Sequence, residues 1–185
     1  MKIKHISMIT VIALSISSFI IPKEDVKAIF VFKKGSNITD WRILNDGVMG
    51  GISSSTFKIN KEGKGVFQGK VSTANNGGFA SVRYRCSAKT RNSKSIVIRL
   101  RGDGKEYQFR IKKNASDFMS YITSFSTTGE WQTIEIKLSD LYPSFRGRKL
   151  KQPNFNETKF EEISFLIANK KNESFKLTLD KIQFN

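Results

Sequence analysis

Four arginines lie in segments where polar and apolar residues alternate, and their side chains are the strongest candidates for binding chemistry. They are Arg83, Arg99, Arg101 and Arg110. The planar guanidinium group donates paired hydrogen bonds to a carboxylate, sulfate or phosphate, so arginines gathered on one face predict an anion-binding site. The net charge of +16, from 32 Lys and Arg against 16 Asp and Glu, favours the same class of partner. A solvated lysine-rich surface is the alternative interpretation.

The other candidate binding residues are two aromatic residues and three residues in glycine-rich segments. Trp41 and Phe79 offer rings on which a ligand can stack, although aromatic side chains more often close a core. Asp46 and Met49 belong to a run that contains three glycines, and Asp103 lies between two glycines. An Asp beside Gly commonly caps its own backbone in a turn, so turn building is the alternative for both acids.

The sequence provides few groups for catalysis. Its single histidine, His5, lies in the N-terminal segment, so the rest of the chain has no imidazole for acid–base catalysis or metal binding. Cys86 is the single cysteine, which excludes an intrachain disulfide and predicts a small buried apolar residue. Neither a phosphate-binding loop nor a dense loop of oxygen ligands is present. We therefore expect no catalytic residue, no bound metal and no cofactor.

Segment 95–112 shows the clearest alternation of apolar and polar residues. Asp103 and Gly104 are typical of a two-residue type I′ turn, because both turn positions need positive φ angles. The sequence therefore predicts a hairpin in which Leu100 lies opposite Tyr107. This register directs the large apolar residues towards the core and the three arginines of the segment away from it.

Similar alternation predicts strands along the rest of the chain, and no long segment has the 3.6-residue period of a helix. The C-terminal strand changes parity near Asp180, which predicts a β-bulge. A helical turn is expected only at 139–142. About ten short strands separated by turns indicate an all-β protein, a jelly-roll β-sandwich. Further strands are expected at 55–60, 65–71, 80–86, 119–125, 133–138, 163–168 and 175–184.

Residues 1–28 have the layout of a secretory signal. Two lysines precede an apolar run at 6–21, and residues 26–28 resemble a cleavage site. We therefore expect an exported protein, in the periplasm or another extracytoplasmic compartment, whose mature part is a single domain at 29–185 without a transmembrane span. An uncleaved N-terminal anchor is the alternative, because the apolar run is near the length that spans a bilayer.

Four blocks of the sequence, taken in order, resemble a known family. The first block covers 41–53, the second 69–83 and the third 101–107, and the fourth combines Trp131 with 143–148. They resemble the complex I intermediate-associated protein 30 family. The resemblance implies a galactose-binding-like jelly-roll domain and a chaperone-like role, without known catalysis, in the assembly of respiratory complex I (NADH:ubiquinone oxidoreductase). An export signal departs from that role.

The sequence therefore predicts a non-catalytic binding or assembly-factor domain whose partner is a protein, such as a membrane or respiratory complex. The alternative is an exported carbohydrate-binding module that recognises an acidic glycan through its arginines. An enzyme that relies on pairs of acids ranks third. Nucleic acid is not expected as a partner, because export separates the protein from it and no recognised motif is present.

Overall fold

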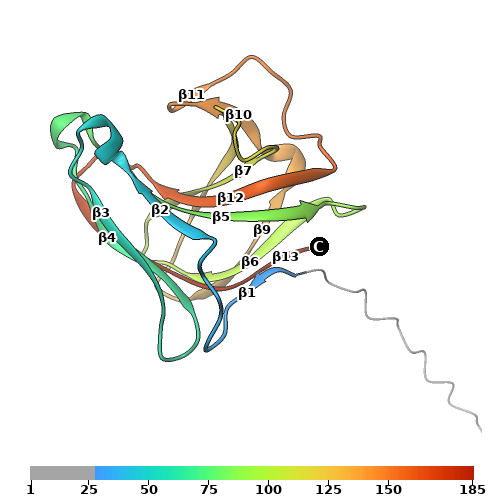
Figure 1. Ribbon diagram of the computed structural model, residues 1–185, viewed down its shortest axis with the longest axis horizontal. Helices are drawn as coiled ribbons and strands as arrows, with labels where there is room; N and C mark the ends of the chain where they lie inside the picture. Colours follow the sequence, from blue (N-terminus) through green and yellow to red (C-terminus); the bar gives the residue numbers. More distant parts are fainter. Residues whose placement is uncertain (1–27) are drawn as a thin grey trace, which may run out of the picture.

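The computed structural model describes residues 28–185, which form two antiparallel sheets packed face to face (Figure 1). In strand order, the six-stranded sheet contains β3 (Ser54–Ile59), β4 (Gly65–Val71), β13 (Glu173–Phe184), β6 (Ser95–Arg101) and β9 (Trp131–Lys137), and β1 (Ala28–Val31) pairs with β13. The seven-stranded sheet contains β11 (Arg148–Lys149), β10 (Tyr142–Phe145), β8 (Ser120–Ser126), β7 (Glu106–Lys112), β12 (Lys159–Ile167), β5 (Ala80–Lys89) and β2 (Trp41–Asn45). The connections contain the short 3-10 helices η1 (Asp46–Met49), η2 (Ala74–Asn76) and η3 (Leu138–Asp140).

Alternating apolar residues of both sheets fill the space between them. Ile98 and Leu100 of β6 and Tyr107 and Phe109 of β7 are fully buried and belong to one cluster. Burying a side chain of this size contributes about 1.5–3 kcal/mol, so the two inner faces supply most of the driving force for folding. The predicted all-β jelly-roll sandwich is confirmed, with thirteen strands in residues 28–185 rather than about ten.

The predicted hairpin at 95–112 is wrong, because β6 and β7 lie in different sheets. Leu100 of β6 pairs with Leu179 of β13, whereas Tyr107 of β7 pairs with Phe125 of β8. Alternation places the same residues in the core whether two strands pair side by side or face each other across a sandwich. The inward residues were therefore predicted correctly and their pairing was not.

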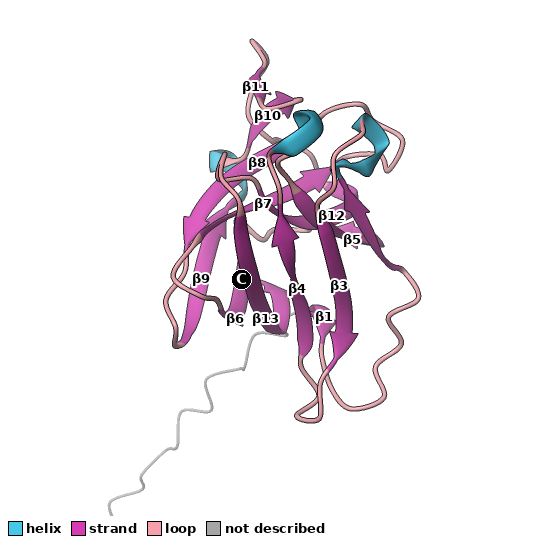
Figure 2. Cartoon of the chain, turned by 90° about the vertical axis from the view of Figure 1, so that its left-hand side faces the viewer, coloured by secondary structure: helices cyan, strands magenta, loops and turns pink. Residues whose placement is uncertain are grey.

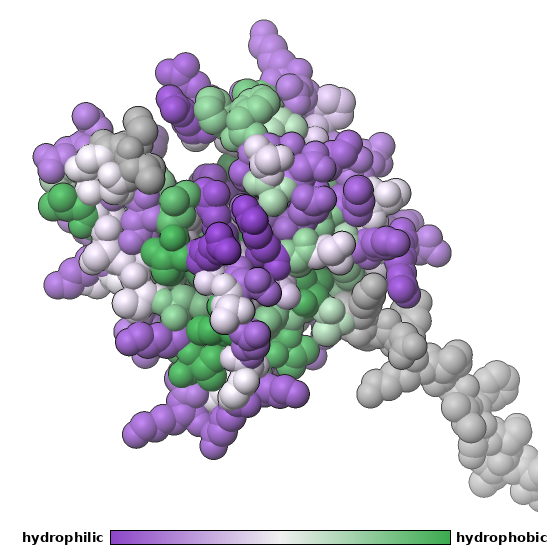
Figure 3. Space-filling view, viewed as in Figure 1, coloured by the Kyte–Doolittle hydropathy of each residue, from purple (hydrophilic) through white to green (hydrophobic). Residues whose placement is uncertain are grey.

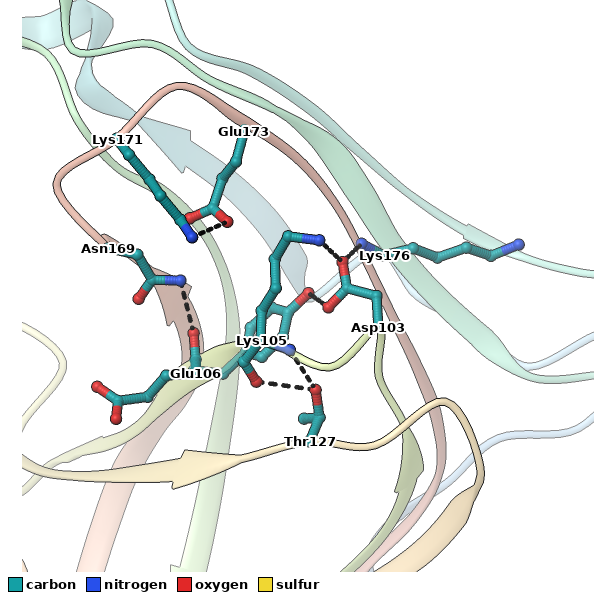
Figure 4. Close-up of polar contacts among 9 residues, drawn as sticks. Asp103, Lys105, Glu106, Thr127, Asn169, Lys171, Glu173 and Lys176 are labelled. Atoms are coloured by element: carbon teal, nitrogen blue, oxygen red, sulfur yellow. Dashed lines mark hydrogen bonds and ion pairs between the residues drawn. The ribbon is translucent and has the colours of Figure 1, made fainter.

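Asp103 holds the point where the chain crosses from one sheet to the other (Figure 4). Its carboxylate accepts a hydrogen bond from the backbone N–H of Lys176 in β13, at 2.9 Å, and another from the buried hydroxyl of Tyr107 in β7, at 3.0 Å. Burial, followed by the charge of Asp103, raises the pKa of that Tyr107 hydroxyl and keeps it protonated. A side chain at Gly102 would collide with Thr127. The Asp-Gly pair therefore builds a turn, but one that joins two sheets.

This crossing separates the four predicted arginines. Arg99 and Arg101 point outward from the six-stranded sheet, because they alternate with the buried residues of β6. Arg83 and Arg110 lie on β5 and β7 of the seven-stranded sheet. The four side chains therefore occupy opposite outer faces of the sandwich.

Other predictions have mixed outcomes. The β-bulge near Asp180 is confirmed by a register shift in the pairing of β13 with β6. The helical turn expected at 139–142 is η3, and β10 follows it. Except for Ala28, the predicted signal segment 1–28 lies outside the described residues. No helix within 28–185 is long and apolar enough to cross a bilayer.

Glu173, the first residue of β13, has a buried carboxylate whose charge is stabilised by few neighbouring groups. Its side chain is 6% exposed, and neither carboxylate oxygen has a hydrogen-bond partner within the described part of the chain. The ammonium nitrogen of Lys171 lies 3.9 Å from one oxygen, but the Lys171 side chain is 64% exposed (Figure 4). Burying a charge with so weak a partner destabilises a fold.

Replacing Glu173 with Met is expected to raise the free energy of unfolding by about 1 kcal/mol, because it removes a desolvated charge at similar side-chain length. Urea unfolding followed by circular dichroism measures the change. Glu62→Met, at an exposed position in the turn between β3 and β4, is the matched control and should change stability by less than about 0.5 kcal/mol. A Glu173→Met protein that is less stable than the parent would contradict this account.

Candidate functional site

The outer face of the seven-stranded sheet brings two of the predicted arginines together. Arg83 of β5 lies opposite Ser164 of β12, and Ser164 lies opposite Arg110 of β7. Neighbouring strands are about 4.8 Å apart, so the two arginines flank one small residue on the same surface. Both arginines therefore belong to one part of the outer face.

The guanidinium group of Arg110 is largely desolvated and has only a neutral partner. Two of its nitrogens donate hydrogen bonds to the side-chain carbonyl oxygen of Gln108, Nε at 3.0 Å. Burial, together with the positive charge of Arg83, lowers the pKa of Arg110 to about 10, so the group stays charged at neutral pH. No carboxylate within residues 28–185 lies within 4.0 Å of it.

Two neighbouring cations of this face, Arg83 and Lys112, also lack a close carboxylate partner among the described residues. Nη1 of Arg83 is 3.8 Å from a carboxylate oxygen of Glu162, which is too long for a hydrogen bond. Lys112 donates a 2.6 Å hydrogen bond to the backbone carbonyl of Asp117, and burial lowers its pKa. The part of the face around Arg110 therefore combines three cationic side chains with the carboxylate of Glu162, which lies opposite Lys112 in the pairing of β12 with β7.

Aromatic rings border this surface on two sides. Phe79 follows η2 on one side, and Phe118 and Phe145 lie on the other, with ring centroids 5.3 Å apart and planes at 85°. Phe118 is 68% exposed and Phe145 is 37% exposed. In Figure 3 the space between the two sides appears as the gap between the projection at the upper left and the one at the top.

Together these residues enclose a groove of about 600 Å³. Its polar lining contains five cationic residues and, in the described part of the chain, no carboxylate. A concave surface with positive charge and apolar rings suits an anionic ligand that also has apolar groups. The cationic residues are Arg83, Arg110, Lys112, Arg146 and Lys170, and the rings are those of Phe79, Phe118 and Phe145.

Asp46 holds the backbone of the segment that carries Phe79, on one side of the groove. Its fully buried carboxylate accepts hydrogen bonds from the backbone N–H groups of Ser53, Gly78 and Phe79 and from the hydroxyl of Ser53. Burial alone would raise the pKa of Asp46, but these hydrogen bonds outweigh it and hold the pKa below its ordinary value of 3.8. Asp46 therefore positions Phe79 at the groove without reaching a ligand itself.

The structure places the remaining predicted residues elsewhere. Trp41 is buried and stacks on Tyr84, with ring centroids 4.8 Å apart. Arg99 and Arg101 lie over the ring of Trp131 on the six-stranded sheet, at 5.5 and 5.3 Å. The backbone of Met49 belongs to η1, and its side chain is outside the described part of the structure. Asp103 joins the two sheets.

The groove therefore gathers Phe79, Arg83 and Arg110 from the residues predicted by sequence. It adds Lys112, which alternates with Arg110 on β7 and which the same parity directs away from the core. Sequence reasoning missed Gln108, Phe118, Phe145 and Arg146. Phe118 and Arg146 lie outside strands, so no periodic signal pointed to them. The described residues contain no group of three or more His, Cys, Asp or Glu side chains that could hold a metal ion.

Comparison with protein families gives one match over most of the chain. A family model described as Complex I intermediate-associated protein 30 matches residues 30–179. A curated relative, the mitochondrial Complex I intermediate-associated protein 30 of Drosophila melanogaster, is 22% identical over 147 residues, covering 67% of this chain and 50% of the relative. The chain thus spans about half the length of that relative.

Solved structures that share this architecture include a carbohydrate-binding module and an agarase. The family 11 carbohydrate-binding module of Clostridium thermocellum, in complex with a β-1,3-1,4-mixed-linked tetrasaccharide, aligns with a TM-score of 0.62 and 17% identity over 83% of this chain and 93% of the module. An exo-β-agarase aligns with a TM-score of 0.52 and 12% identity over 85% of this chain and 25% of the enzyme. At these identities the likeness shows the jelly-roll fold alone.

One sequence prediction is overturned by these comparisons. Export to the periplasm or another extracytoplasmic compartment is wrong, because the family match leads to a Drosophila relative that is a mitochondrial protein.

Replacing Asp46 with Asn is expected to lower the free energy of unfolding at neutral pH by about 2 kcal/mol, because an amide nitrogen would face buried donors. The lowered pKa of Asp46 adds a pH dependence with a defined sign. The native carboxylate contributes stability above the ordinary pKa of 3.8, and that contribution is lost as the pH falls through and below this value.

Urea unfolding of both proteins from about pH 6 to about pH 3 measures this dependence. The stability difference between parent and Asp46→Asn should shrink towards the acid end. Asp140→Asn, at an exposed position in η3, serves as the control and should show no such convergence. A difference that stays constant over the range would argue against the hydrogen-bonded carboxylate.

Proposed function

The chain belongs to the complex I intermediate-associated protein 30 family, and on that premise we propose that it is a non-catalytic assembly factor that holds a protein partner of respiratory complex I in its groove. The single observation that carries this proposal is the groove on the seven-stranded sheet, with five cationic side chains and three phenylalanines in its lining. Such a surface suits an acidic segment of a protein that also presents apolar side chains.

The charge state of the groove supports binding rather than catalysis. Arg110, with a pKa of about 10, keeps its proton at neutral pH and so acts as a fixed hydrogen-bond donor. Arg83 on β5 and Lys112 on β7 are held in the same rigid sheet, on the two strands that flank β12. Fixed cations that are already desolvated lose little further solvation when an anionic partner covers them.

A carbohydrate-binding module that recognises an acidic glycan is the second candidate. It is favoured by the fold shared with a carbohydrate-binding module at a TM-score of 0.62, and by the aromatic rings that border the groove. The cationic lining would select a glycan that carries carboxylate or sulfate groups. The family membership favours a protein partner instead.

Partner capture tests the leading function. The full chain and its Arg83→Gln/Arg110→Gln variant are immobilised. Each is then exposed to a detergent extract of membranes from the cells in which the protein naturally occurs. We expect the parent to retain complex I subunits, which mass spectrometry identifies. The variant should retain at least about tenfold less, because each substitution removes an ionic contact with the partner.

The control for this experiment is Arg99→Gln/Arg101→Gln, which removes the same charge from the six-stranded sheet. It should retain subunits within about twofold of the parent, since neither residue lies near the groove. Equal losses in both variants, or a parent that retains no complex I subunit above background, would refute the groove as the binding site.

Calorimetric titration separates the second candidate from the first. A glycan-binding module should bind polygalacturonate with a Kd below about 1 mM and lose this binding in Arg110→Gln. A neutral mixed-linkage β-glucan is the control ligand, because it is a polysaccharide without carboxylates. The assembly-factor proposal predicts no measurable heat with either polymer.

A further inference from the structure

The hairpin formed by β10 and β11 projects from one end of the sandwich and carries a basic surface (Figure 2). Its segment 145–151 contains four cationic residues, no acidic residue, and the apolar residues Phe145 and Leu150. All four cationic residues are exposed. They are Arg146, Arg148, Lys149 and Lys151. We call this segment, together with Phe118, the hairpin tip.

The charge of the hairpin tip is not neutralised. None of its four cations has a carboxylate within 4.0 Å in residues 28–185. By contrast, Lys113 in the loop that leads to Phe118 forms a 2.7 Å ion pair with Glu157. The tip therefore presents a local field that attracts an extended anionic surface.

Two rings at the tip are exposed beside these charges. Phe118 is 68% exposed and packs edge to face against Phe145, which is itself 37% exposed. The guanidinium of Arg146 lies 5.3 Å from the centre of the Phe145 ring. Large apolar rings flanked by cations are typical of surfaces that enter the boundary between lipid headgroups and acyl chains.

The backbone of the turn holds Arg146 in an uncommon conformation. Arg146 and Gly147 have φ angles of 47° and 75°, which make a tight turn between β10 and β11. Glycine adopts positive φ freely, but a long side chain there costs conformational energy. The fold thus keeps a cation at the outermost point of the hairpin, where Asn or Gly would be less strained.

We propose that the hairpin tip docks the protein on an anionic lipid surface, with Phe118 and Phe145 at the headgroup boundary and the four cations against lipid phosphates. The planes of the two rings differ by 85°, so they do not form the parallel platform on which successive bases of a nucleic acid stack. The hairpin tip shares Phe118, Phe145 and Arg146 with the groove, but Arg148, Lys149 and Lys151 do not line the groove. Substitutions at these three residues therefore test the tip without changing the groove.

Vesicle sedimentation of the full chain tests this proposal. The probes are vesicles of phosphatidylcholine alone and of phosphatidylcholine with phosphatidylglycerol at about 7:3. We expect the anionic vesicles to bind the parent at least about tenfold more tightly, and Arg148→Glu/Lys149→Glu to lose most of that preference. Phe118→Ser should weaken binding several-fold without changing its dependence on salt, because it removes apolar contact and no charge.

A matched charge reversal keeps the test specific. Lys58→Glu/Lys61→Glu changes the net charge by the same amount near the end of β3 and in the turn that follows it, at the opposite end of the sandwich (Figure 2). Retention of the lipid preference in this variant, alongside its loss in Arg148→Glu/Lys149→Glu, supports the hairpin tip. Equal losses in the two variants overturn it.

Thermal unfolding checks that each variant is folded. Lys149→Gln/Lys151→Gln is a second, milder variant, which should lose part of the preference for anionic vesicles. A parent that binds polyglutamate or a DNA duplex but shows no preference for anionic vesicles also overturns the proposal. Complex I capture is measured separately on the groove variants, so failure of either proposal is visible without the other.

Discussion

The crossing between the two sheets at Asp103 is the interaction on which the surface chemistry depends. By bonding to the backbone of β13 and to the hydroxyl of Tyr107, this carboxylate joins a strand of one sheet to the first residues of a strand in the other. β7 can then pair with β12, which places Arg110 one strand away from Ser164 and two away from Arg83. If β6 and β7 paired as a hairpin instead, Arg110 would lie opposite Val97 of β6, and β7 would no longer be next to β12 and its Ser164.

The groove shows how a rigid sheet can keep like charges together. Arg83, Arg110 and Lys112 repel one another, yet backbone ladders fix their strands, and neutral acceptors such as Gln108 and the carbonyl of Asp117 hold two of the side chains. The repulsion and desolvation cost stability, and the large core of the sandwich offsets it. Binding of an anion would relieve this repulsion and stabilise the surface. This property is expected of a binding domain.

The sequence predicts the class of fold, the buried residues and the bulge well, because all three follow from alternation within one strand. It cannot predict which strands become neighbours. Leu100 and Tyr107 point into the same core whether they pair directly or face each other, and the Asp-Gly signal between them fits both cases. The hairpin turn between β10 and β11, with positive φ angles at Arg146 and Gly147, has only one glycine and was not predicted. Phe118, Phe145 and Arg146 reach the groove from segments that long-range packing alone brings beside Arg110.

The Asp46 carboxylate has a consequence for how relatives of this chain can diverge. A β-carbon at Gly51 would collide with that carboxylate, and one at Gly77 would come within 2.7 Å of its oxygen. A β-carbon at Gly77 would also meet the backbone carbonyl oxygens of Ser72 and Ala74, at 2.7 and 2.9 Å, so the surrounding backbone requires this glycine whatever stands at position 46. The three nearest atoms to a β-carbon at Gly51 all belong to the side chain of Asp46, and its own β-carbon is one of them, at 2.8 Å. Positions 46 and 51 should consequently change together in relatives, with non-additive effects, whereas Gly77 should persist on its own.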